Sequence, residues 1–175
     1  MLFSRLIPDY MFSRYDEVTP EFLRSIGVRV LLADIDNTLA PYEQPDPDDR
    51  HRAWLASLAQ AGISVALVSN NGRARVERFN ETLGLTAYWD CGKPSRKFLD
   101  RAMAELSGSV ADTAVLGDQL LTDAYAGKRL GLVTIIVPPI RDKKTLFFRF
   151  KRLLERPFLR AYRRREARRR VSEEK

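Results

Sequence analysis

Four short apolar runs, separated by segments of helix length, constrain the fold of this chain more than any other feature of its sequence. The runs cover residues 28–34, 63–69, 112–118 and 132–137. The first three are dominated by aliphatic residues and end in a polar one, a pattern typical of central parallel strands covered on both faces. The fourth stops at Pro138, which has no N–H to offer a sheet.

The segments between these runs have the lengths and terminal residues of helices. We expect helices at about residues 48–61, 73–83, 95–107 and 120–130, each followed by a glycine of the kind that ends helices. A shorter strand is expected at residues 86–89. Strands that alternate with helices predict an α/β fold, a three-layer Rossmann-like architecture with a parallel sheet.

Polar residues stand at the ends of three predicted strands. Because ligands bind at the carboxyl ends of strands in such sheets, Asp34, Ser69 and Asp118 are expected around one crevice. Asp34 is followed two residues later by Asp36. One aspartate of such a pair can attack phosphorus to form an aspartyl-phosphate, and the other can protonate the leaving alkoxide and then activate water.

Further residues near the strand ends suit a phosphate and a cation. Ser69 offers a hydroxyl before a predicted helix, whose N-terminus favours anions. Lys93 offers a compact positive charge, with Lys97 as a rival that lies inside a helix. Asp118 and Asp123 add two carboxylates, although Asp123 could instead be a helix-surface acid. Carboxylates beside a phosphate favour Mg²⁺.

The order of these residues resembles the four motifs of the haloacid dehalogenase (HAD) superfamily. DIDNT at 34–38, Ser69, Lys93 and GDxxxxD at 117–123 follow one another as in that family, over about 90 residues and without a departure at these positions. Residues 6–39 are, more narrowly, similar to the start of YqeG-type subfamily IIIA phosphatases. Those phosphatases are similar to mitochondrial and plastid phosphatidylglycerophosphate phosphatases.

The resemblance implies a role for each motif residue. Asp34 is expected to be the nucleophile, and Asp36 the general acid/base and, through its carbonyl, a metal ligand. Ser69 and Asn70 are expected to bind the phosphate, and Lys93 to neutralise the aspartyl-phosphate. The implied cofactor is Mg²⁺, with oxygen ligands from Asp34, Asp36, Asp118 and Asp123.

The spacing of the motifs leaves no room for a cap domain. Thirty residues separate Thr38 from Ser69 and 23 separate Ser69 from Lys93, enough only for the elements expected there. An uncapped crevice favours a large phosphate monoester, such as one on a lipid headgroup. We therefore predict a Mg²⁺-dependent phosphomonoester hydrolase, and the resemblance favours dephosphorylation of phosphatidylglycerophosphate to phosphatidylglycerol.

The positive charge of the chain is concentrated at its C-terminal end. Residues 141–175 hold 15 Lys and Arg against 5 Asp and Glu, so we divide the chain into a HAD-like phosphatase domain at 1–140 and a basic amphipathic helical tail at 141–175. Pro157 is expected to kink or divide the tail helix, or to begin a second one. One arc of a helical projection gathers apolar residues, namely Leu146, Phe147, Phe150, Leu153, Leu154 and Phe158. Another arc gathers arginines, namely Arg149, Arg152, Arg156, Arg160 and Arg163.

Three interpretations of this tail remain open. A basic amphipathic helix is typical of a protein that binds an anionic membrane surface, here through residues 145–170. Arginine-rich segments also bind nucleic acid, so an RNA- or ribosome-associated factor is an alternative. The structural interpretation is that residues 146–154 pack on the sheet and the arginines are solvated.

The substrate also has an alternative: the enzyme could act on a soluble or protein-bound phosphate.

The composition excludes several other classes of site. A single cysteine, Cys91, excludes a disulfide framework, and a single histidine, His51, excludes histidine metal clusters. We expect His51 on an exposed helical turn without a chemical role. No apolar run is long enough to span a bilayer, and charged residues interrupt the N-terminal segment where a secretory signal would be apolar. We expect a cytoplasmic protein, peripheral at the inner face of the membrane if the tail binds lipid.

Overall fold

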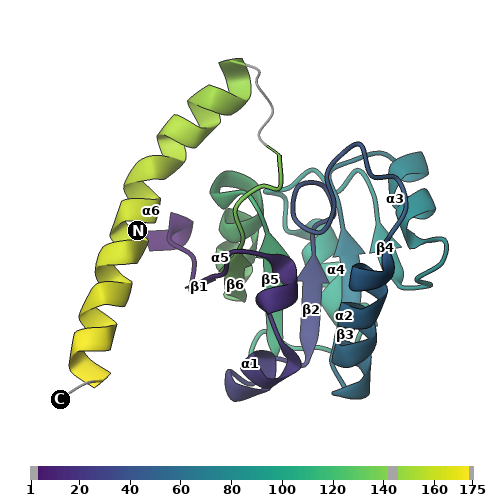
Figure 1. The fold of residues 1–175 in the computed structure, drawn as a ribbon, viewed down its shortest axis with the longest axis horizontal. Coiled ribbons are helices and arrows are strands. Elements are labelled where there is room, and N and C mark those ends of the chain that lie inside the picture. The colour runs from purple at the N-terminus through teal and green to yellow at the C-terminus, as the bar shows by residue number, and fades with distance from the viewer. Residues whose placement is uncertain (1–3, 142–145, 174–175) are drawn as a thin grey trace.

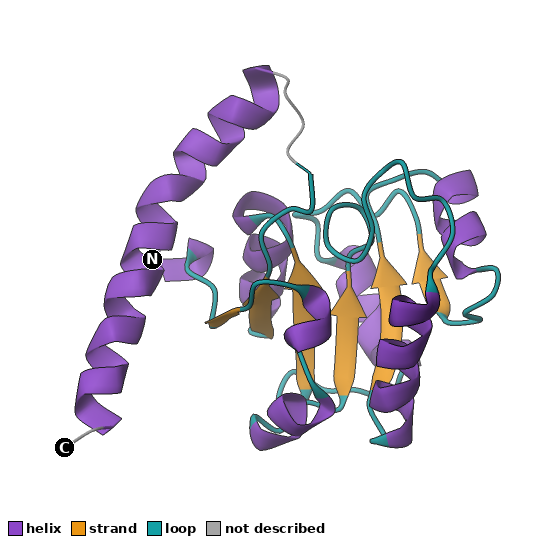
Figure 2. Cartoon of the chain, in the orientation of Figure 1, coloured by secondary structure: helices purple, strands orange, loops and turns teal. Residues whose placement is uncertain are grey.

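A parallel sheet forms the centre of the molecule (Figures 1 and 2). The computed structural model describes residues 4–141 and 146–173, and in it six strands lie in the order β1-β6-β5-β2-β3-β4. The central strand β2 is buried along its whole length, as expected for an aliphatic run with helices on both sides. The strands are β1 (Tyr10–Met11), β2 (Val30–Ala33), β3 (Ser64–Val68), β4 (Thr86–Tyr88), β5 (Thr113–Gly117) and β6 (Val133–Ile136).

Helices cover both faces of this sheet (Figure 2). On one face, α1, α2 and α3 pack against a cluster that includes Leu31 and Leu67. On the other face, α4 and α5 pack against Leu32 and Val68, the alternate residues of the same strands. The helices are α1 (Pro20–Ser25), α2 (Asp49–Gln60), α3 (Arg73–Asn80), α4 (Lys97–Glu105), α5 (Tyr125–Leu130) and α6 (Leu146–Glu173), with short turns η1 (Ser4–Leu6), η2 (Tyr15–Glu17) and η3 (Leu120–Ala124).

The predicted three-layer α/β architecture is confirmed. The predicted runs coincide with β2, β3, β4, β5 and β6, and the expected helices lie between them. The segment expected as one helix at 120–130 begins with the π-helical turn η3 before it continues as α5. No apolar run predicts strand β1. Backbone hydrogen bonds on either side of it attach it to β6, from Asp9 N to Thr134 O and from Phe12 N to Ile136 O.

The prediction of an exposed His51 is wrong. The side chain is only 3% exposed and lies in the first turn of α2, between Tyr15 and Phe79. Its Nε2 lies 2.8 Å from the carbonyl oxygen of Leu39, and its Nδ1 accepts a hydrogen bond from the backbone N–H of Asp48. His51 therefore joins the start of α2 to the loop that follows β2.

The C-terminal helix α6 is continuous through Pro157 and lies beside the N-terminal segment, at the β1 edge of the sheet (Figure 1). Phe158 and Leu159 pack against the body, whereas Leu153 and Leu154 are 54% and 44% exposed. The structural interpretation, in which residues up to Leu154 pack on the sheet, therefore fails for these two leucines.

The structure does not describe the side chains of residues 146–152. This range includes Leu146, Phe147 and Phe150 of the predicted apolar arc, and Arg149 and Arg152 of the arginine arc. Among the helices of the described ranges, none has both the length and the apolar character that crossing a bilayer requires.

Asp112 provides a test of the fold away from the carboxyl edge of the sheet. Its carboxylate accepts hydrogen bonds from Ser109 N at 2.6 Å and from Arg29 at 2.6 Å, just before β5 begins. These donors lower the pKa of Asp112 to about 2, so the folded state favours the ionised carboxylate. The resulting stabilisation is complete above the ordinary pKa of about 4 and is lost as the pH falls towards 2.

We expect Asp112→Asn to lower the free energy of unfolding by about 1–2 kcal/mol at neutral pH. Urea unfolding at several pH values measures this, with Asp49→Asn at an exposed site as the control. The difference between wild type and Asp112→Asn should shrink from about pH 5 towards pH 2. A difference that does not change with pH would contradict the assignment.

Candidate active site

A polar pocket opens at the carboxyl ends of the parallel strands. Its volume is about 270 Å³. The loops after β2, β3 and β5 meet there, as they must in a parallel sheet whose central strands lie side by side. The lining residues come from these loops and from the segment before α4: Asp34, Asp36, Tyr42, Ser69, Asn70, Asn71, Lys93, Gln119, Thr122 and Asp123.

The buried ammonium of Lys93 connects two of the loops. Its Nζ lies 2.7 Å from Asp34 Oδ1 and 2.6 Å from Asp123 Oδ1. It also donates a hydrogen bond of 2.7 Å to the carbonyl oxygen of Val68, the last residue of β3. The sequence rival Lys97 lies within α4 and has an exposed side chain. Lys93 is therefore the lysine of the site.

The side chain of Asn70 holds Lys93 in place. Lys93 N donates to Asn70 Oδ1 at 2.7 Å, and Asn70 Nδ2 donates to the carbonyl oxygen of Lys93 at 3.1 Å. This paired contact fixes the backbone of Lys93 against the loop after β3. One of the two N–H donors of the Asn70 amide is thus used by the backbone of Lys93, and the residue still lines the pocket.

Burial and charge act in opposite directions on Asp34 and Lys93. Burial raises the pKa of Asp34 to about 6, and the ammonium of Lys93 limits this rise. Burial alone would lower the pKa of Lys93, but the charges of Asp123 and Asp34 outweigh it and raise that pKa above its ordinary value. Lys93 therefore keeps its proton and stabilises the ionised form of the carboxylate beside it.

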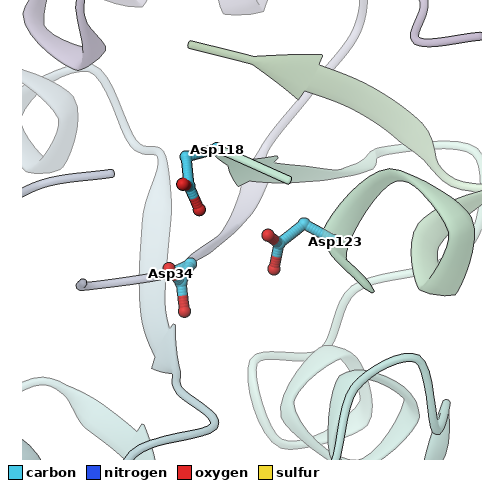
Figure 3. Close-up of side chains that lie close together, drawn as sticks. All are labelled: Asp34, Asp118 and Asp123. Carbon is cyan, nitrogen blue, oxygen red and sulfur yellow. The ribbon is translucent and has the colours of Figure 1, made fainter. Parts of the chain in front are cut away.

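Three buried carboxylates gather at the carboxyl ends of β2 and β5 (Figure 3). Each of Asp34, Asp118 and Asp123 offers an oxygen, and these oxygens lie within 4.8 Å of one another. Gly117 makes this arrangement possible, because a Cβ at that position would lie 2.4 Å from the side chain of Asp123. A set of oxygen donors, all anionic and buried, fits a small divalent cation such as Mg²⁺.

The loop after β2 presents two aspartates, Asp34 and Asp36, to the pocket. Asn37 adopts a positive φ of 65°, and the N–H groups of Thr38, Leu39 and Ala40 converge on the carbonyl oxygen of Ile35. This tight turn brings Thr38 Oγ1 within 3.2 Å of Asp34 Oδ2, to which it donates a hydrogen bond. The turn explains how two carboxylates so close in sequence occupy one side of the pocket.

Asp36 is held by residues that the sequence did not single out. Asn71 Nδ2 donates to Asp36 Oδ2 at 3.1 Å, and Arg75 Nε donates to Asp36 Oδ1 at 3.0 Å. Ser69 Oγ accepts a hydrogen bond from Asn71 N at 3.0 Å, which places this hydroxyl in the same loop. The position of Asn71 next to Asn70 in the sequence is a usable signal, whereas nothing in the sequence distinguishes Arg75 from the other arginines of its helix.

Other pocket residues carried no sequence signal. Tyr42 lines the pocket although it lies outside the motifs, and Gln119 and Thr122 line it from unspecified positions of the GDxxxxD motif. Burial and the nearby aspartates raise the pKa of Tyr42 to about 12, so its phenol remains a hydrogen-bond donor at neutral pH. The alternative of a helix-surface Asp123 is excluded, because that residue is 1% exposed.

No cap domain is inserted between the motif residues. The described residues from Thr38 to Ser69 contain a loop, α2 and β3, and those from Asn70 to Lys93 contain α3, β4 and short loops. The prediction of an uncapped fold is confirmed.

Comparison with known proteins agrees with this architecture. Residues 90–139 match the family model described as HAD-hydrolase-like. The chain is 36% identical over 164 residues to the Probable phosphatase YqeG of Bacillus subtilis, an alignment that covers 94% of this chain and 95% of that protein. This relative extends the similarity through the N-terminal segment and the C-terminal helix.

Two solved structures share the fold at low sequence identity. A protein of Legionella pneumophila described as a hydrolase of HAD subfamily III A is 22% identical, with a TM-score of 0.50 over 67% of this chain and 71% of that one. The cobalt-bound deoxy-D-mannose-octulosonate 8-phosphate phosphatase of Haemophilus influenzae is 16% identical, with a TM-score of 0.50 over 78% and 87%. The chain therefore belongs to the HAD-like hydrolases and, within them, to the YqeG-type phosphatases.

Proposed function

We propose that this HAD phosphatase is Mg²⁺-dependent, acts through an aspartyl-phosphate on Asp34 and dephosphorylates phosphatidylglycerophosphate at an anionic membrane surface. The observation that carries the chemistry is the Lys93 ammonium, 2.7 Å from Asp34 Oδ1 and 2.6 Å from Asp123 Oδ1, at the base of an open pocket. A carboxylate that is buried, charge-compensated and accessible from one side suits nucleophilic attack on an anionic phosphate.

The first step forms a bond between an oxygen of Asp34 and phosphorus and breaks the bond from phosphorus to the leaving oxygen. Asp36 donates its proton to that oxygen, so the product leaves as an alcohol. Arg75 and Asn71 orient the Asp36 carboxyl, to which both are hydrogen-bonded. Lys93 offsets the negative charge that Asp34 and the phosphoryl group bring together.

The second step releases phosphate. Asp36, now ionised, takes a proton from a water molecule whose oxygen attacks phosphorus, and the bond between phosphorus and Asp34 breaks. Ser69 Oγ accepts a hydrogen bond from Asn71 N, which leaves its own proton available to donate to a phosphoryl oxygen near the start of α3. Asp34 and Lys93 then return to the ion pair described above.

A divalent cation fits the cluster formed by Asp34, Asp118 and Asp123. Asp34, Asp118 and Asp123 would hold Mg²⁺, with the backbone carbonyl of Asp36 as a further ligand. When bound, the ion supplies positive charge that offsets the repulsion between the phosphate and the buried carboxylates.

The substrate class follows from the open pocket and from α6. A pocket without a cap admits a phosphate on a large or surface-bound molecule. The side of α6 that faces away from the body carries arginines that are exposed and, among the described residues, have no carboxylate within ion-pair distance. We call this side the arginine face; it consists of Arg156, Arg160, Arg164 and Arg168.

The arginine face supports a membrane partner more than a cytosolic small molecule. Each basic residue close to an anionic leaflet contributes about 1 kcal/mol, so the face as a whole suffices for reversible binding. The apolar residues Phe158 and Leu159 are used for packing on the body, which leaves Leu153 and Leu154 as exposed apolar residues beside the arginines. Binding would therefore be mainly electrostatic.

Replacing the nucleophile tests the chemistry. Asp34→Asn should lower kcat for an aryl phosphate more than about 10³-fold, because an amide cannot form the phosphoenzyme. Phosphate release measures this, with Asp49→Asn on the exposed surface of α2 as the control. Circular dichroism should show that both variants are folded. Substantial turnover by folded Asp34→Asn would refute the assignment of the nucleophile.

Metal removal tests the carboxylate cluster. Chelation with EDTA should abolish turnover and added Mg²⁺ should restore it, because a single ammonium compensates the three carboxylates only in part and their remaining negative charge repels the phosphate. Asp118→Asn should raise the Mg²⁺ concentration needed for half-maximal activity by about tenfold or more. Full activity in EDTA would show that the cluster serves another purpose.

Changing the arginine face tests the membrane partner. The triple change of Arg156, Arg160 and Arg164 to Gln should weaken binding to phosphatidylglycerol vesicles about a hundredfold, since about 1 kcal/mol is lost at each position. Hydrolysis of phosphatidylglycerophosphate in those vesicles should fall with it, while aryl phosphate turnover stays unchanged.

The matched control for this variant is the triple change of Arg50, Arg52 and Arg101 to Gln, three exposed arginines on the body. Equal vesicle binding by the two triple variants would contradict a specific role of α6. Loss of RNA binding, with vesicle binding intact, would instead favour the RNA-associated alternative.

A further inference from the structure

A carboxylate of the C-terminal helix reaches the segment that carries Asp123. Glu155 lies in α6 and is 1% exposed. Its Oε1 accepts a hydrogen bond of 3.0 Å from the backbone N–H of Leu120. Leu120 is the first residue of η3, directly after the pocket residue Gln119. A residue distant in the sequence thus contacts the backbone at the edge of the catalytic pocket.

This contact gives an acceptor to an N–H group at the start of the helical segment formed by η3 and α5. The first N–H groups of a helix have no partner within the helix, and its N-terminus favours a negative charge. The preceding residue, Gln119, forms no capping hydrogen bond with its side chain. Glu155 therefore provides from outside the acceptor and the charge that a local cap would otherwise supply.

The segment capped in this way fixes Asp123. Asp123 N donates to the carbonyl oxygen of Gln119 at 3.0 Å, and Gln119 N donates to Asp123 Oδ2 at 3.3 Å. The other oxygen of Asp123 lies 2.6 Å from Lys93 Nζ. A shift of Leu120 would move Gln119, and with it the carboxylate that holds the ammonium next to Asp34.

The helix that carries Glu155 is itself anchored. Phe158 and Leu159 pack with Leu120 and Ala124, so apolar contacts accompany the hydrogen bond to Leu120. Further along α6, hydrogen bonds attach the helix to the N-terminal segment. Tyr162 Oη accepts from Met11 N at 3.0 Å, and Arg165 donates to the carbonyl oxygens of Pro8 and Asp9 at 2.6 and 2.9 Å.

We propose that Glu155 is a positioning residue of the phosphatase site, through which α6 holds the segment from Gln119 to Asp123 in its active geometry. The proposal rests on the assigned roles of Asp123 and Lys93. It makes α6 part of the catalytic unit as well as the carrier of the arginine face. Deletion of the tail would then impair hydrolysis of every substrate, including soluble ones that need no membrane.

Substitution of Glu155 tests this proposal. Glu155→Ala removes the acceptor, whereas Glu155→Gln keeps an acceptor of the same size without the charge. Glu166→Ala is the matched control, since it removes a carboxylate from the same helix, has no described polar partner and lies away from the pocket. The measurements are amide hydrogen exchange, turnover of an aryl phosphate and the Mg²⁺ dependence of that turnover.

In Glu155→Ala, amide exchange at residues 119–124 should become about tenfold faster, as expected when one hydrogen bond to a charged group is lost, with β2 and β3 unchanged. The value of kcat should fall and the Mg²⁺ requirement should rise together, with Glu155→Gln between Glu155→Ala and wild type. If Glu155→Ala matches Glu166→Ala in exchange or in kcat, the proposal is wrong. Absence of turnover in wild type would refute the proposed function instead, and the exchange comparison would then decide the role of Glu155 alone.

Discussion

The ion pair of Lys93 with Asp34 and Asp123 is the interaction on which the site depends. Three carboxylates are buried at the carboxyl edge of the sheet, where they repel one another. Removing the ammonium of Lys93 would leave these charges uncompensated, and breaking a buried ion pair in this way typically lowers the free energy of unfolding by about 3–5 kcal/mol. The carbonyl of Val68 and the side chain of Asn70 fix where that ammonium lies. The geometry of the candidate site is therefore determined by contacts between loops that the parallel sheet brings together.

The loops after β2 and β5 are also held by residues from elsewhere in the chain. Arg75 of α3 binds Asp36 after β2, and Glu155 of α6 binds Leu120 after β5. His51 of α2 contacts the carbonyl of Leu39 at the far end of the first loop. An uncapped enzyme has no second domain to close over its substrate, so its own helices must provide the rigidity that keeps the reacting groups in place.

Sequence reasoning identified the sheet and the motif residues because both depend on local patterns. Aliphatic runs that end in Asp34, Ser69 and Asp118 locate the strand edges, and a parallel sheet places those edges together. Partners such as Arg75 and Glu155 are set by packing between distant elements, and a charged residue on a helix gives no sign of burial before the fold is known. The interpretation in which the tail packs on the sheet fails for the same reason, since Leu153 and Leu154 are exposed while Phe158 and Leu159 pack inward.

The central claim is that Asp34 accepts the phosphoryl group with Lys93 beside it. The most direct measurement is a crystal structure of the protein with Mg²⁺ and beryllofluoride, a mimic of a phosphoryl group on a carboxylate. The account predicts beryllium bonded to an oxygen of Asp34, with Lys93 Nζ and Ser69 Oγ within hydrogen-bond distance of the fluorines. Beryllofluoride bound to another carboxylate, or a saturated crystal in which Asp34 remains unmodified, would contradict it.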